Sequence, residues 1–342
     1  ISNIASGRGY VGGYIGNTSL GANVTINGRD NALINPTKLS ASLGRGAYVG
    51  NANQAFIATS SGAMISDGTS EFSDKAVEID ANSTNGGYLA TALNGTVYHN
   101  VDMGNGISGD GTEKNPYIIK NTNDLLMLAI AINTMNSTAM EKFDTLNITS
   151  RVDKREYLTH AYYQVTGDID LNETGFKGIG FYISDSFYQG FHGSFAGKQF
   201  TANDGTMRYP VIHFDNTYAQ GKAGLFAMLY GTDSNNEKKS KFPINNTQAV
   251  VKNLNLSGNI YAGSNYIGGI AGLISNGTVS NCGVNIRNIQ SSLNIKTESG
   301  SYIGGLVGYG QFSKIKTKVA LEFENISIQR TASFGTTEEN WE

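Results

Sequence analysis

The sequence has very little cysteine and proline, with one Cys and four Pro among 342 residues. The single cysteine, Cys282, cannot form an internal disulfide, so no disulfide framework holds the fold. This is compatible with an exported bacterial protein, and composition alone fits a cytosolic origin equally well. Four prolines are also too few for a disordered linker rich in proline and glycine.

Charge and long apolar runs are scarce as well. Charged residues make up 15% of the chain and the net charge is −3, so the basic excess typical of nucleic-acid binding is missing. The longest apolar run, residues 125–132, is far shorter than a membrane span. The four histidines form no His-Glu-x-x-His motif, which argues against zinc protease chemistry. We therefore expect no nucleic-acid partner, no membrane span, no metal and no cofactor.

Glycine, by contrast, is abundant, with 43 residues, and it belongs to a repeated motif. The pattern aromatic–branched–Gly–Gly–apolar–apolar–Gly occurs at residues 10–16, 266–272 and 302–308. The last two copies start 302 − 266 = 36 residues apart, a period typical of repeat architectures. Glycine suits a repeat with tight corners because it adopts positive φ without steric cost. We predict an all-β fold, a parallel β-solenoid. Its inward-facing ladders are predicted to contain Ile267, Ile270, Ile303 and Leu306.

Changes in composition along the sequence divide the chain into three parts. Residues 104–116 form a turn-rich break, and one short helix is predicted near 123–134, with its apolar residues on a single face. We therefore place a domain boundary near 106. Residues 1–105 are expected to be degenerate solenoid coils, and residues 106–330 a second solenoid module whose open end the helix caps. Residues 331–342 are predicted to be a polar tail or linker. Because the chain begins at Ile1 without a signal segment, we expect it to be a piece of a larger protein.

A set of short motifs follows in order from residue 106 to about residue 316. The set comprises Gly-Thr-x-x-x-Pro-Tyr at 111–117, Asp-Leu-Leu at 124–126, Gly-Asp-Ile-Asp-Leu at 167–171, Phe-x-Gly-x-Phe-x-Gly at 191–197, Ala-Gly-Leu-Phe at 223–226 and the two Gly-Gly-x-x-Gly copies. This order resembles the GLUG-repeat module of bacterial cell-surface proteins. The same motif occurs in the N-terminal region of immunoglobulin A1-specific metalloproteases. Residues 1–105 match the module by spacing alone.

The resemblance implies a right-handed parallel β-solenoid with a location that is extracellular or on the bacterial cell surface. It implies an adhesive role, linked to cell adhesion and virulence, and no catalytic residues. We accordingly expect a non-catalytic surface module that acts as an adhesin, a ligand-binding arm or a stalk. The expected partner is a host glycan or protein, or a component of the cell envelope.

A second class of function stays open, because some parallel β-helices cleave polysaccharides. The chain would then be part of an enzyme, either a polysaccharide-degrading β-helix or the substrate-docking region of a larger secreted protease. Glycoside hydrolysis uses two carboxylates about 5–9.5 Å apart, and Asp168 and Asp170 have the spacing of neighbours on one face of a strand. Their place in a repeat motif favours hydrogen bonds to turn amides instead.

Two tyrosines are the other candidate site residues. Tyr266 and Tyr302 occupy equivalent positions in the two clear repeats, so we expect them to stack in adjacent coils, about 4.8 Å apart. Packing of the repeat explains such a ladder, and the alternative interpretation is an aromatic platform for sugars. The candidate ligand-binding residues are therefore Tyr266, Tyr302, Asp168 and Asp170, with no catalytic residue assigned.

Overall fold

The structure of the chain is a computed structural model in which strands predominate. It describes residues 101, 104–172, 174, 176, 178–184, 187–218, 222–231, 248–262, 266–275, 283–297, 302–311 and 321–328, together with Ile15 and the backbone of nine short strands in residues 1–100. Strands account for 48% of these residues, and most strand pairs are parallel. The prediction of a strand-rich fold built from parallel sheets is confirmed. Cys282 and the tail at 331–342 lie outside the described residues.

The chain forms two compact units, residues 1–102 with 173–176, and residues 103–172 with 177–342. The strands of the first unit are β1 (Ile4–Ser6), β2 (Tyr10–Gly12), β3 (Asn23–Ile26), β4 (Leu39–Ala41), β5 (Gly44–Gly46), β6 (Asn53–Thr59), β7 (Ile65–Ser66), β8 (Phe72–Ser73) and β9 (Asn94–His99). Strands β1 and β4, β2 and β5, and β3, β6 and β9 pair in parallel, whereas β7 and β8 form an antiparallel pair.

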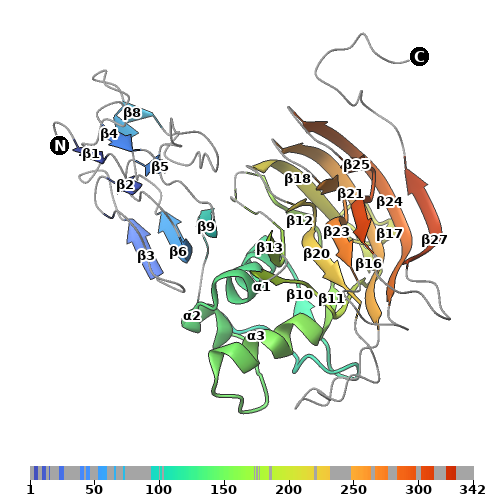
Figure 1. The fold of residues 1–342 in the computed structure, drawn as a ribbon. Coiled ribbons are helices and arrows are strands. Elements are labelled where there is room, and N and C mark those ends of the chain that lie inside the picture. Colours follow the sequence, from blue (N-terminus) through green and yellow to red (C-terminus); the bar gives the residue numbers. More distant parts are fainter. Residues whose placement is uncertain are drawn as a thin grey trace, which may run out of the picture. The chain divides into compact units, whose positions relative to one another are not determined.

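Parallel strands also make up the larger sheets of the second unit (Figure 1). The largest sheet contains β10 (Tyr117–Ile119), β11 (Tyr162–Val165), β12 (Ile169–Asp170), β15 (Ser194–Gly197), β18 (Val211–Tyr218), β21 (Gln248–Ala262), β24 (Gly283–Thr297) and β27 (Leu321–Ile328). A second sheet runs in the order β19 (Lys222–Ala223), β22 (Tyr266–Gly268) and β25 (Tyr302–Gly304). A third runs β20 (Phe226–Tyr230), β23 (Ala271–Ser275) and β26 (Val307–Gln311). Two antiparallel hairpins complete the strands, β13 (Phe181–Ser184) with β14 (Phe187–Gln189), and β16 (Phe200–Thr201) with β17 (Met207–Arg208).

The register of these sheets places each repeat residue beside its equivalent in the next repeat. Tyr266 pairs with Tyr302, and Ile267 with Ile303, at the predicted offset of 36. Ile267 and Ile270 are fully buried, and Leu306 is also buried, as predicted. Ile303 is only half-buried, which differs from the prediction. The difference arises because β25 is the last strand of its sheet in the described part of the chain, so no following strand covers it.

The described residues form three helices where the sequence predicted one. They are α1 (Thr122–Thr134), α2 (Ser137–Met140) and α3 (Arg151–His160). Helix α1 begins at the cap residue Asn121, whose side chain accepts a hydrogen bond from the Asp124 amide at 3.0 Å. The sequence predicted burial of one face of this helix, but every residue from Leu125 to Thr134 is buried. The reason is that α2, α3 and β12 all contact α1.

Glycine has a specific packing role in the repeats. The third glycine of each motif, Gly272 or Gly308, faces the backbone of the preceding repeat, and a Cβ there would lie 2.7 Å from the Ala223 nitrogen or 2.4 Å from the Ile267 nitrogen. Such distances exclude any side chain without movement of the backbone. The third glycine of the motif is therefore required for neighbouring repeats to pack this closely.

A column of three asparagines runs along the largest sheet. Asn253, Asn288 and Asn325 each have a positive φ, of 62°, 52° and 51°. The Asn288 Nδ2 donates to the Asn253 Oδ1 at 2.8 Å, and the Asn325 Nδ2 donates to the Asn288 Oδ1 at 2.9 Å. Asparagine suits these positions because it tolerates the left-handed region and carries both a donor and an acceptor.

Candidate ligand-binding surface

Three tyrosines from adjacent strands gather into one group, the tyrosine cluster Tyr266, Tyr302 and Tyr309. The ring centroids of Tyr266 and Tyr302 are 5.3 Å apart, as their pairing in register requires. Tyr309 on β26 adds a third ring, 4.8 Å from Tyr266 and 4.9 Å from Tyr302. The structure thus brings the two predicted tyrosines together and adds one that the sequence analysis did not select.

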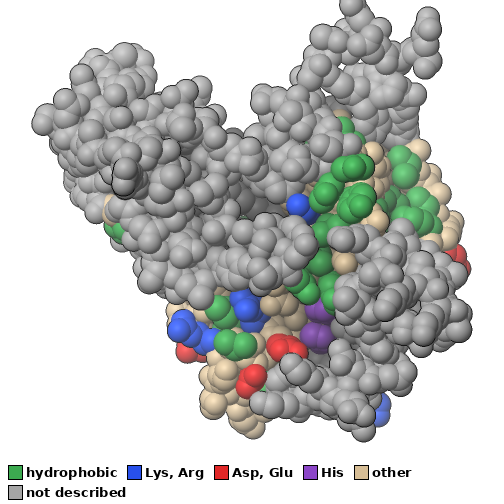
Figure 2. Space-filling model, viewed as in Figure 1, with side chains coloured by type: hydrophobic (Ala, Val, Ile, Leu, Met, Phe, Trp, Pro, Cys, Tyr) green, Lys and Arg blue, Asp and Glu red, His purple; other side chains and the backbone are tan. Residues whose placement is uncertain are grey.

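The cluster is partly open to solvent and carries a cation. Tyr302 is 48% exposed, and Tyr266 and Tyr309 are half-buried. The Lys222 Nζ lies 4.4 Å from the centroid of the Tyr266 ring, within cation–π distance. In the same view as Figure 1, hydrophobic side chains gather on one face of the described part of the molecule (Figure 2). Exposed aromatic faces beside hydroxyls and an ammonium can bind a ligand that has both apolar and polar edges.

Lys222 and Tyr309 escaped the sequence analysis because the repeats are degenerate. Lys222 pairs in register with Tyr266, so it occupies the tyrosine position of the preceding repeat. Tyr309 pairs with Leu273, so the equivalent position in the preceding repeat is aliphatic. A comparison of the two repeats therefore shows no shared aromatic residue there. An alignment of the repeats that includes residues 222–226 places Lys222 opposite Tyr266. An alignment that continues past the seven motif residues includes Tyr309.

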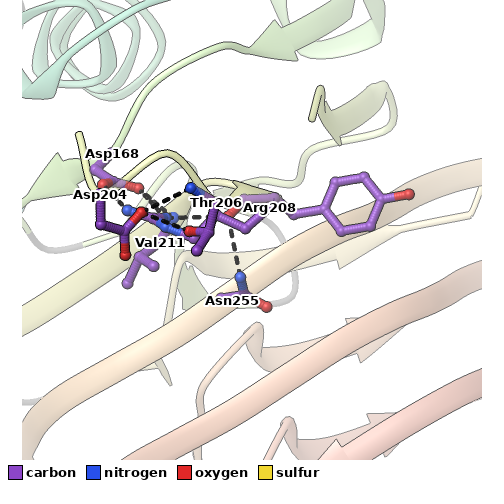
Figure 3. Close-up of polar contacts among 7 residues, drawn as sticks. Asp168, Asp204, Thr206, Arg208, Val211 and Asn255 are labelled. Carbon is purple, nitrogen blue, oxygen red and sulfur yellow. Dashed lines mark hydrogen bonds and ion pairs between the residues drawn. The ribbon is translucent and has the colours of Figure 1, made fainter. Parts of the chain in front are cut away.

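Asp168, the first carboxylate candidate, forms an ion pair with Arg208 (Figure 3). The Arg208 Nη1 donates to the Asp168 Oδ1 at 2.7 Å, and the Val211 amide donates to the same oxygen at 2.8 Å. The Arg208 guanidinium also lies over the Phe200 ring of its own hairpin, 5.1 Å from the centroid. The hydrogen bonds from Arg208, above all, hold the pKa of Asp168 below its usual value. An acid kept ionised in this way is unsuited to donate a proton.

The arginine side of this ion pair continues into a short polar network. Arg208 also donates to the Tyr209 carbonyl, which accepts a second bond from the Asn255 Nδ2 at 3.0 Å (Figure 3). Asp204 accepts from the Thr206 amide at 2.9 Å within the turn of the same hairpin. These contacts fasten hairpin β16–β17 to the sheet, a structural role for Asp168 and Arg208.

Asp170, the second carboxylate candidate, lies at the end of β12. Its Oδ1 accepts from the Asn172 amide at 3.0 Å, a local turn bond. Its backbone N–H donates a hydrogen bond to the Thr122 hydroxyl oxygen at 3.0 Å, which ties β12 to the start of α1. Both aspartates therefore accept backbone N–H bonds, the arrangement that the structural interpretation of their motif predicts.

Two further properties concern the described residues as a whole. Among them, no group of three or more His, Cys, Asp or Glu side chains is placed to hold a metal ion. None of the helices they form is long and apolar enough to cross a membrane. Comparison of the chain with protein-family models, curated proteins and solved structures found no match.

Proposed function

We propose that residues 106–330 form a right-handed parallel β-solenoid of the GLUG-repeat type, with residues 1–105 as further degenerate coils. Support comes from strand partners that lie about one repeat apart, such as Tyr266 with Tyr302 and Val251 with Ile286. The asparagine column adds support, because a side chain that bonds to its own equivalent requires repeats stacked in register. The module belongs to a bacterial protein that is extracellular or attached to the cell surface.

The function of this module is non-catalytic binding, and its site is the tyrosine cluster with Lys222. The observation that carries the proposal is the 48% exposure of Tyr302 within the tyrosine cluster. Tyr302 offers this exposed side chain beside Tyr309, and the Lys222 ammonium lies over the Tyr266 ring of the same cluster. A glycan fits, because a sugar ring packs its apolar face on an aromatic ring while its hydroxyls bond to polar neighbours.

The test is direct binding of the whole chain to glycans. A glycan array selects the ligand, and calorimetric titration then measures its affinity for the wild type and for Tyr302→Ala. We expect Tyr302→Ala to weaken binding about tenfold, equivalent to ~1.4 kcal/mol. Tyr188→Ala is the matched control, because Tyr188 is also an exposed tyrosine but lies on β14. Saturable binding that Tyr302→Ala leaves unchanged contradicts the assignment of the site, and no saturable binding to any glycan contradicts the function.

A further inference from the structure

Two histidines stack where helix α3 meets the strands. The rings of His160 and His192 have centroids 4.4 Å apart and planes within 4° of parallel. His160 is the last residue of α3, and His192 lies two residues before the start of β15. The backbone joins at the same place, because the His192 amide donates to the Thr159 carbonyl at 2.8 Å and the Ser194 amide to the Ala161 carbonyl at 3.1 Å. The ring stack thus lies on the joint between α3 and the sheet.

His192 sits in surroundings that favour its neutral form. The Tyr230 ring meets it edge-on, with centroids 5.0 Å apart. The His192 Nδ1 is buried and has no hydrogen-bond partner among the described residues. Protonation would place a second N–H on Nδ1, where that donor would be buried without an acceptor, which is costly.

The groups around the pair do not reverse this preference for the neutral form. On α3, the His160 Nδ1 lies 2.8 Å from the Glu156 carbonyl oxygen, and the Glu156 carboxylate is the charged group that favours a protonated His160. On β20 Tyr230 faces His192, and on β14 Tyr188 stacks on Tyr230 at 5.8 Å. Burial outweighs Glu156 and lowers the pKa of both histidines, and the two rings, if both were charged, would repel each other.

A metal site is a poor alternative for this pair. The lone pair of an imidazole nitrogen lies in the plane of its ring, and a metal ion binds close to that plane. The two ring planes are nearly parallel and stacked, so one ion cannot lie in both of them. The geometry therefore favours titration over metal binding.

We propose that His160 and His192 form an acid-sensitive latch, closed when both rings are neutral and stacked, which holds the end of α3 against β15 and β20 and opens on protonation. Because the pKa values are lowered in the closed state, the open state binds more protons. The latch is therefore at full strength above about pH 6.5, the ordinary pKa of histidine, and weakens as the pH falls below that value.

The experiment is hydrogen exchange of the whole chain at pH 7.5 and pH 5.0, corrected for intrinsic exchange rates. Peptides covering residues 156–163 and 188–196 report on the joint, and a β24 peptide, residues 284–291, is the reference. If one proton opens the latch, the opening constant of the joint rises about thirtyfold between these pH values relative to the reference.

Two variants separate the latch from general acid destabilisation. His192→Phe keeps a flat ring that cannot be protonated, and we expect its rise to fall below about threefold. His213→Gln removes an exposed histidine on β18 and should keep the full rise. A wild-type NMR titration gives an independent readout if His192→Phe does not fold. A full rise in His192→Phe, or a His192 midpoint at or above pH 6.5, overturns the proposal.

Discussion

Gly308 lies so close to the backbone nitrogen of Ile267 that a Cβ at position 308 would stand 2.4 Å from it. The two residues belong to neighbouring repeats, and Gly272 stands in the same relationship to Ala223 one repeat earlier, with 2.7 Å between the ideal Cβ and the backbone nitrogen. The third glycine of the motif is thus set by contact between repeats.

Gly308→Ala should destabilise the second unit by about 2–3 kcal/mol, because the new methyl group meets backbone atoms that cannot rotate away. The measurement is the free energy of unfolding from chemical denaturation. Gly106→Ala is the control, because the nearest atom to its Cβ would be the Lys142 carbonyl oxygen at 3.6 Å, an ordinary contact. Equal stability of the two variants would show that the repeats can separate at no cost.

Asn288→Ala should destabilise more than Asn288→Gly. Both variants lose the side-chain bonds to Asn253 and Asn325, worth roughly 0.5–1.5 kcal/mol each. Only alanine adds the cost of a left-handed backbone, about 1 kcal/mol, since the φ of 52° is accessible to glycine without strain. Denaturation of the three proteins in parallel measures the difference. A glycine variant that is the weaker of the two would mean that backbone conformation is not what selects asparagine here.

Asp168 should make stability depend on pH in the acid range. Its pKa is lowered in the folded state, chiefly by the hydrogen bonds from Arg208. The contribution is therefore present above the ordinary aspartate pKa and is lost as the pH falls through the lowered folded value. The gap in unfolding free energy between wild type and Asp168→Asn should shrink as the pH is lowered from 5 to 2. A gap that is constant with pH would contradict the ion pair.

The chain should not cleave polysaccharides. Asp168 is held by Arg208 and the Val211 amide, and Asp170 by the Asn172 amide, so neither is placed to donate a proton. The assay incubates the whole chain with a panel of polysaccharides and follows new reducing ends and unsaturated products. Turnover that disappears in Asp168→Asn or Asp170→Asn would replace the binding function with catalysis.

The sequence was most informative where the repeat is regular. The 36-residue interval placed Tyr266 beside Tyr302, and the apolar run at residues 125–132 located α1. Helix α3 was missed because, in its polar sequence, only Tyr157, Leu158 and Thr159 are buried, which leaves too little apolar periodicity to detect.

The repeat period could not predict contacts between segments that are not related by one fixed interval. The asparagine column joins positions 35 and then 37 residues apart, so a search at one fixed period does not align them. His160 ends a helix, and His192 lies in the segment before a strand, and the two segments share no motif. Only the folded chain shows that their rings stack.

The parallel pairing of β21, β24 and β27 also has a mechanical meaning. Backbone hydrogen bonds join these strands side by side. A force that pulls the end of β27 away from β24 therefore breaks these hydrogen bonds one after another rather than all at once. Peeling β27 and then β24 would release about 36 residues per step, roughly 120 Å of extended chain at ~3.4 Å per residue. Under such a load, the second unit would lengthen in discrete events, each of which dissipates work while the remaining layers stay folded.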